Sequence, residues 1–219
     1  MNRAPRIAVW DIPTRLFHWV LVGLLAFSWW SAENGRLDWH LTSGLSILAL
    51  LVFRLIWGVI GSSTARFVGF LRGPRSIAAY LRGKTPPVAG HNPLGGWSVV
   101  AMLAVLSVQV GSGLLAVDVD GIESGPLSYL VEFDQGRTAA SIHDISFNVL
   151  LALIVLHVLT ILFYLVVRRR NLVGPMITGR DHALDPAAAP LRRGKLWAFL
   201  LSLVVAVAAA WWVASGAPV

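Results

Sequence analysis

The chain has 219 residues, of which 56% are hydrophobic and only 13% are charged, and its mean hydropathy of +0.69 is far above that of soluble domains. The absence of cysteine excludes disulfides, thiolate metal sites, cysteine-ligated iron–sulfur clusters and covalently attached c-type haem. The formal charge of +7 does not indicate nucleic-acid binding, because no soluble basic domain is present to perform it. We therefore expect an integral membrane protein whose partner is the lipid bilayer.

Five apolar runs are each long enough to cross about 30 Å of hydrocarbon as a helix. They lie near residues 14–32, 39–60, 95–117, 141–167 and 196–214. Trp29 and Trp30 stand where a signal peptide would need small residues, so we expect the first run to remain as a helix. The predicted fold is an all-α integral membrane protein, with a four-helix transmembrane core in residues 1–180. Residues 181–219 would form an inner-side linker and a fifth transmembrane helix.

The basic residues predict the orientation of the spans. With the N-terminus inside, fifteen of the 18 Lys and Arg residues fall in inner segments, and only Arg36 and Arg137 fall in outer loops. This bias predicts a multi-pass protein of the bacterial inner membrane with a cytoplasmic N-terminus and a periplasmic C-terminus. The outer loops are acidic and would favour a basic partner; they hold Glu33, Asp38, Asp118, Asp120, Glu123, Glu132 and Asp134. The inner segment 64–84 either lies on the membrane surface or only enforces the topology.

Four of the six histidines fall within predicted spans, where ionisable groups are costly and are candidates for function. His143 and His157 lie fourteen residues apart on one helix, which is about 21 Å at helical rise and nearly the same face. His40 matches His143 near the outer side, and His18 matches His157 near the inner side. Each pair offers two imidazoles from facing helices, which is the arrangement that holds a b-type haem. The sequence thus predicts two stacked haems.

Other roles for these histidines compete with this hypothesis. A single intramembrane histidine often forms a hydrogen bond between helices. A haem-free transporter or relay, moving protons or a divalent metal, would also use imidazoles, although it fits the paired depths poorly and the spans contain no chain of carboxylates. Asp144, beside His143, is expected near the interface, where it would cap the fourth helix.

Other residues in the spans also suggest contacts with a cofactor. Arg54 lies fourteen residues after His40 and would pair with a haem propionate in the inner layer, or else extend to the inner interface. Gly44, and the pair Gly111 and Gly113 in the third span, would let a flat ring approach the backbone or simply let helices pack. Gln109 would bond to a neighbouring helix or touch a cofactor, and the sequence leaves both open.

Four segments together resemble the bacterial cytochrome b561 family, which includes the cytochrome b subunits of nickel–iron hydrogenases. They are VWDIPTRLFHW, DWHLTSGLSILALLVFRLIWG, HNPLGGW and HDISFNVLLALIVLH, and the resemblance covers roughly residues 8–180. It implies a four-helix di-haem core that exchanges electrons between the quinone pool and a redox partner. By match of motif, the resemblance implies that His18, His40, His143 and His157 are the iron ligands. The fifth helix lies outside it and would serve as an anchor or a docking surface, including for a second copy.

Two oxidoreductase functions follow from this reading. The first passes electrons between quinone and a periplasmic protein such as a c-type cytochrome or a hydrogenase. The second oxidises superoxide outside the membrane and reduces quinone, but the acidic outer loops disfavour an anionic substrate. Polar residues considered for a quinone site are Asp144, Glu132 and Tyr129 on the outer side, and His91 and Tyr80 on the inner side.

Overall fold

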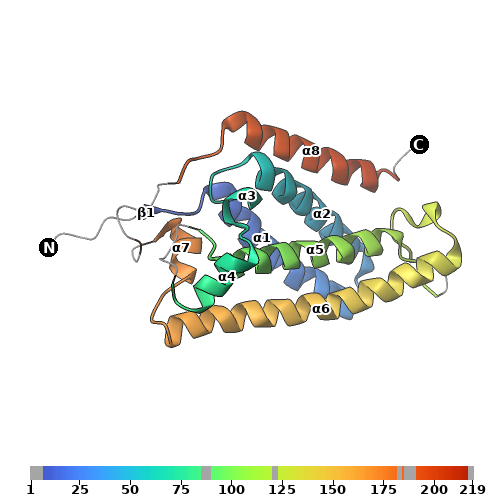
Figure 1. Ribbon diagram of the computed structural model, residues 1–219. Helices are drawn as coiled ribbons and strands as arrows, with labels where there is room; N and C mark the ends of the chain where they lie inside the picture. The colour runs from blue at the N-terminus through green and yellow to red at the C-terminus, as the bar shows by residue number, and fades with distance from the viewer. Residues whose placement is uncertain (1–6, 85–89, 120–122, 182–183, 185–190, 217–219) are drawn as a thin grey trace. The chain divides into compact units, whose positions relative to one another are not determined.

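The computed structural model describes residues 7–84, 90–119, 123–181, 184 and 191–216 (Figure 1). Within these ranges, five helices are long and apolar enough to cross a membrane. They are α1 (Ile12–Glu33), α2 (Leu37–Ile60), α5 (Pro93–Leu115), α6 (Phe133–Val166) and α8 (Leu196–Ala214). The prediction of an all-α membrane protein is confirmed.

The remaining elements are short. The helical ones are α3 (Phe67–Phe70), α4 (Pro74–Leu81), the 3-10 turn η1 (Ser128–Leu130) and α7 (Val173–Thr178). The strands β1 (Ile7–Ala8) and β2 (Arg180–Asp181) form one antiparallel pair, with Ile7 opposite Asp181. This pair joins the segment before α1 to the segment after α7.

Local side-chain chemistry explains where the long helices begin. The carboxylate of Asp11 accepts a hydrogen bond of 2.9 Å from the backbone N–H of Thr14, which caps the start of α1. The amide oxygen of Asn92 accepts one of 2.7 Å from the N–H of Gly95 and caps α5 in the same way. Between α1 and α2, Gly35 takes a positive φ of 63°, which permits the tight turn.

Helix α6 begins at Phe133, earlier than the start near residue 141 that the sequence predicts. Its first turns pack against the chain that follows α5: Arg137 Nη1 donates to the carbonyl of Val117 at 3.0 Å. A Cβ at Gly136 would overlap the Val117 side chain, so glycine permits this close approach. The prediction that Asp144 caps the helix is therefore wrong, because Asp144 lies in the helix interior.

The chain divides into two compact units. The first comprises residues 1–16, 55–101 and 155–200, and the second comprises residues 17–54, 102–154 and 201–219. Each of the five long helices contributes one segment to each unit.

Trp57 forms the centre of the first unit, with 2% of its surface exposed. Its indole Nε1–H donates to the Asp11 carboxylate at 3.0 Å, and its ring meets Phe199 edge to face at 6.2 Å. A Cβ at Gly61 or at Gly194 would overlap the same ring. The beginning of α1, the end of α2 and the beginning of α8 thus meet around one tryptophan.

In the second unit, α8 is attached by a different contact. The Tyr129 hydroxyl in η1 donates to the carbonyl of Gly216, just beyond the end of α8, at 2.6 Å. Aromatic rings of α1 and α2 also pack together, with Phe27 stacked on Trp39 at 5.9 Å. His40 and His143, the pair that the sequence assigns to the outer layer, also lie in this unit.

Candidate functional site

His40 on α2 and His143 on α6 face each other in the second unit. Their ring centroids are 5.9 Å apart and the ring planes are at 85°. Both side chains are half-buried. The structure thus brings together the two histidines that the sequence assigns to the outer layer.

The partner of His40 identifies which ring nitrogen carries the proton. Its Nδ1 lies 2.9 Å from the carbonyl oxygen of Ser28 on α1, and 3.1 Å from the Ser28 hydroxyl. Because a carbonyl oxygen can only accept, Nδ1 carries the hydrogen and Nε2 keeps a lone pair. This is the tautomer of a metal-binding imidazole.

His143 is held in the same tautomer by Gln109 of α5. Its Nδ1–H donates to the Gln109 carbonyl oxygen at 2.8 Å. The Gln109 amide Nε2 lies 3.0 Å from His143 Nε2 and donates to its lone pair. Main-chain carbonyls from two different helices therefore orient the two rings.

Gln109 is also connected to Ser146, one turn beyond His143. The Ser146 hydroxyl donates to Gln109 Oε1 at 2.5 Å, and these two side chains are 7% and 9% exposed. Of the two roles left open for Gln109, the structure shows the bond to a neighbouring helix. The sequence analysis did not identify Ser28 or Ser146 as part of the site. Ser146 could have been found because it lies three residues after His143 on the same helix face, whereas no sequence signal indicates Ser28.

The glycines near this site differ in what surrounds them. A Cβ at Gly113 would lie 2.7 Å from His143 Cε1 and 2.8 Å from its Nδ1, so the ring packs directly on this glycine. A Cβ at Gly111 or at Gly44 would meet nothing within 4 Å. Open space at Gly44, one turn from His40, is compatible with a flat ligand beside that histidine.

The other predicted site residues are half-buried or buried in the helices. His18, on α1 in the second unit, has its ring edge-on to Trp19 at 4.8 Å. His157 is half-buried on α6 in the first unit. Arg54 is 2% exposed, and its guanidinium carbon lies 6.0 Å from the centroid of the Phe17 ring. The pairing of His18 with His157 stays a prediction.

The donor set around His40 and His143 fits a metal held by two imidazoles. Among the residues that the structure describes, no group of three or more His, Asp or Glu side chains could hold a metal, so a multi-carboxylate site is not formed there. His40 and His143 each keep a lone pair on Nε2 and could hold an iron through it, in which case His143 would exchange its hydrogen bond from the Gln109 amide for that iron.

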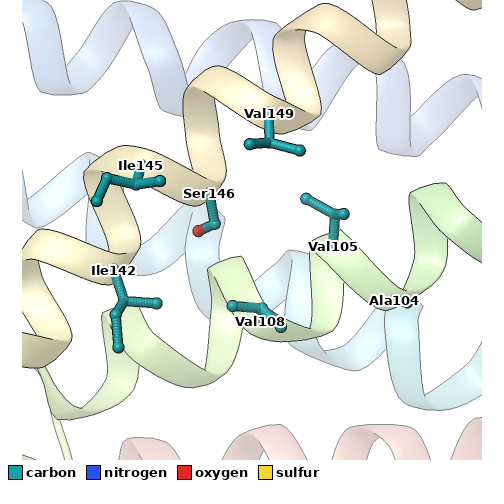
Figure 2. A pocket seen from close by; sticks show the side chains of 7 residues that line it. All are labelled: Ala104, Val105, Val108, Ile142, Ile145, Ser146 and Val149. Carbon is teal, nitrogen blue, oxygen red and sulfur yellow. The ribbon is translucent and has the colours of Figure 1, made fainter.

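A shallow groove with a volume of about 360 Å³ lies between residues 104–108 of α5 and residues 142–149 of α6. Figure 2 shows the side chains that line it. Six are apolar and the seventh is Ser146; the apolar ones are Ala104, Val105, Val108, Ile142, Ile145 and Val149.

Both residues considered for the inner side of a quinone site, Tyr80 and His91, have partners in the first unit. The hydroxyls of Tyr80 and Tyr164 are hydrogen-bonded. Burial and this bond raise the pKa of Tyr80 to about 12, while Arg170 and Arg168 oppose the shift. The His91 ring lies between Trp10 and Phe70, each 4.6 Å away between centroids. His91 therefore packs in an aromatic cluster at the beginning of α5. His182, which lies in the predicted inner-side linker and is not expected to bind a cofactor, is outside the described residues.

On the outer side, the three residues considered are exposed. Tyr129 is bound to the chain after α8, as described above, and the backbone N–H of Glu132 donates to the amide oxygen of Gln135 at 3.1 Å. The carbonyl of Asp144 accepts from Asn148 at 2.9 Å. None of these three residues lines the groove.

Comparison with known proteins identifies the family of this chain. The family model described as prokaryotic cytochrome b561 matches residues 9–179, which contain α1 to α7 and all four intramembrane histidines. No curated protein and no solved structure matches the chain significantly. The chain therefore belongs to the prokaryotic cytochrome b561 family, and is a transmembrane protein that binds haem b and transfers electrons.

Proposed function

We propose that this protein carries electrons between the membrane quinone pool and a redox protein on the periplasmic side, through two haem b groups. His40 and His143 would hold the outer haem, and His18 and His157 would hold the inner one. The observation that carries the proposal is the geometry of the outer pair: two imidazoles that meet edge to face with centroids 5.9 Å apart, each with Nδ1 bonded to a main-chain carbonyl and a lone pair on Nε2.

The chemistry that haem supplies when bound is one-electron transfer. His40 and His143 would hold the iron of the outer haem between them, and iron held by two histidines favours electron transfer over oxygen binding. Ser28 and Gln109 hold the rings through their carbonyls, and half-burial of the histidines limits contact with water. Arg54 would offset the charge of an inner haem propionate; its burial supports this role over extension to the interface.

The charge of the outer loops supports a basic protein partner. Both outer arginines already contact other residues of this chain. The Arg36 guanidinium carbon lies 5.8 Å from the centroid of the Trp39 ring, and Arg137 donates a hydrogen bond to the Val117 carbonyl. A small anion such as superoxide would therefore meet an acidic surface with few cations available to attract it. We accordingly favour a c-type cytochrome or a hydrogenase over superoxide as the outer partner.

The location follows from the charge distribution of the sequence. Fifteen Lys and Arg residues on one side against two on the other support an inner-membrane protein with its N-terminus in the cytoplasm. The C-terminus after α8 would then be periplasmic. The fusion of a periplasm-active or cytoplasm-active reporter to either terminus tests this orientation directly.

The haem assignment can be tested with a reduced-minus-oxidised absorption spectrum and a haem-to-protein ratio. We expect two b haems in the native protein, His40→Ala to remove mainly the outer one, and His18→Ala mainly the inner one. His91→Ala is the matched control, because His91 packs between aromatic rings and should leave both haems in place. The loss of the same single haem in both variants would overturn the pairing.

The partner can be tested by stopped-flow reduction of a basic c-type cytochrome by the quinol-reduced protein. Attraction between opposite charges predicts a second-order rate that falls steeply as ionic strength rises, since the Debye length shrinks to about 8 Å at 0.15 M salt. Asp118→Asn combined with Glu123→Gln should flatten that dependence. A rate insensitive to salt would refute an acidic docking surface.

A further inference from the structure

The first unit exposes a group of positive charges that its acidic residues do not neutralise. We call this group the basic surface, and its exposed members are Arg72, Arg75, Arg82, Lys84, Arg168 and Arg169. Among the described residues of this unit, the acidic side chains are Asp11 and Asp181, and both are buried. Asp11 accepts a hydrogen bond from Trp57, and Asp181 forms an ion pair with Arg170. Within the described part of the chain, no member of the basic surface forms an ion pair.

Helix α4 and its C-cap present part of this surface on one side. Residues three or four positions apart share a helix face, and Arg75, Ala78 and Arg82 are exposed at that spacing. Tyr80, on the opposite side, is half-buried. Leu81 lies beside Arg82 and is 68% exposed although it is apolar. Basic residues beside an exposed apolar side chain are typical of a helix that lies along the surface of a bilayer.

Contacts with two membrane spans indicate that α4 lies at the level of the lipid headgroups. The Trp97 indole Nε1–H on α5 donates to the Arg72 carbonyl at 2.9 Å, and the hydroxyls of Tyr80 and Tyr164 on α6 are hydrogen-bonded. Trp97 lies near the start of its span and Tyr164 near the end of its own, where Trp and Tyr mark the membrane interface. The positive charge of Arg168 opposes the rise that burial causes in the Tyr80 pKa, so the chain after α6 brings its charge close to α4.

The chemistry of this surface suits a phospholipid whose headgroup carries a net negative charge. Guanidinium groups form paired hydrogen bonds with phosphate oxygens. The exposed leucine beside them can contact acyl chains, which a soluble anion lacks. We propose that the basic surface binds anionic phospholipid of the surrounding bilayer, with Arg75 and Arg82 contacting headgroup phosphates and Leu81 reaching the acyl chains. The inference is independent of the haem pairs and of the redox partner, because it uses none of their residues.

A lipid titration of the purified haem-containing protein tests the proposal, with native mass spectrometry to resolve each bound lipid. We expect dioleoylphosphatidylglycerol to bind about tenfold or more tightly than dioleoylphosphatidylcholine, because each arginine near an anionic headgroup contributes about fivefold. Arg75→Gln and Arg82→Gln should each raise the Kd of phosphatidylglycerol about fivefold. Arg36→Gln is the control, because it removes the same charge from an exposed position in the second unit and should leave that Kd unchanged. Equal Kd values for the two lipids, or equal effects of Arg75→Gln and Arg36→Gln, would overturn the proposal.

Hydrogen exchange of the unaltered protein gives a second measurement that does not depend on any variant. The backbone amides of residues 67–84 should exchange more slowly in nanodiscs that contain phosphatidylglycerol than in nanodiscs of phosphatidylcholine alone. Residues 133–140, at the start of α6 in the second unit, are the internal reference and should exchange equally in both. Inorganic phosphate, added to the phosphatidylcholine nanodiscs, separates a soluble anion from a lipid. Equal exchange of 67–84 in the two kinds of nanodisc, or equal protection by inorganic phosphate, would overturn the lipid as the occupant.

Discussion

Gly113→Ala should displace His143 and weaken the binding of the haem that we propose for the outer histidine pair. The new Cβ would lie 2.7 Å from His143 Cε1. A Cβ is essentially never found within 3.0 Å of a non-bonded heavy atom, so one of the two groups must move. The ring cannot simply turn away, because its Nδ1–H is bonded to the Gln109 carbonyl at 2.8 Å. Overpacking of this kind costs about 1–3 kcal/mol. If that cost falls on the ligated state, haem affinity drops about fivefold to about 150-fold, at 1.4 kcal/mol for each factor of ten.

The assay is a haem titration of the purified apoprotein, followed by a redox titration of the reconstituted protein. Gly111→Ala is the control, because it lies two residues away on the same helix and its Cβ would meet nothing within 4 Å. We expect weakened binding of one haem in Gly113→Ala and native behaviour in Gly111→Ala. Equal haem affinities and equal midpoint potentials in both variants would show that the contact of Gly113 with His143 does not position an iron ligand.

Two further predictions concern the first unit. Trp57→Phe removes the donor to the buried Asp11 carboxylate and should lower the free energy of unfolding in detergent by about 1–3 kcal/mol, whereas Trp212→Phe, at a position 49% exposed, should not change it. The raised pKa of Tyr80 implies that its contribution to stability is complete below pH 10 and is lost as the pH rises through about 12. Tyr80→Phe should therefore reduce the loss of stability between pH 10 and 12, and its ultraviolet titration should lack the tyrosine transition near pH 12 that the native protein shows; a titration unchanged by the substitution would refute the assignment.

The long helices could be predicted from the sequence because a run of about 20 apolar residues has one dominant solution in a bilayer. The early start of α6 could not. Residues 133–140 are mixed in polarity and carry no hydropathy signal, and their helix is fixed by contacts with Val117, which is distant in sequence. The same extension explains why Asp144 is not a cap, since capping depends on where the helix begins.

For the candidate site, the positions of His40 and His143 near the outer ends of two predicted spans placed them at one level, and the structure brings them together. The partners of their Nδ1 atoms were not predictable in this way. Main-chain carbonyls leave no trace in the sequence, and serines such as Ser28 and Ser146 are common in membrane helices, where they often bond their own backbone. The inner pair and the role of Arg54 stay predictions, since they depend on side-chain positions that spacing alone does not define.

The use of main-chain carbonyls to orient both imidazoles has a consequence for how freely the sequence can vary. Every residue type at positions 28 and 109 supplies a carbonyl oxygen, so the ring tautomers of His40 and His143 do not depend on side-chain identity there. A substitution of Ser28 should therefore leave the His40 ring in place, whereas one of Gln109 keeps the carbonyl bond but removes the amide that bonds His143 Nε2 and Ser146.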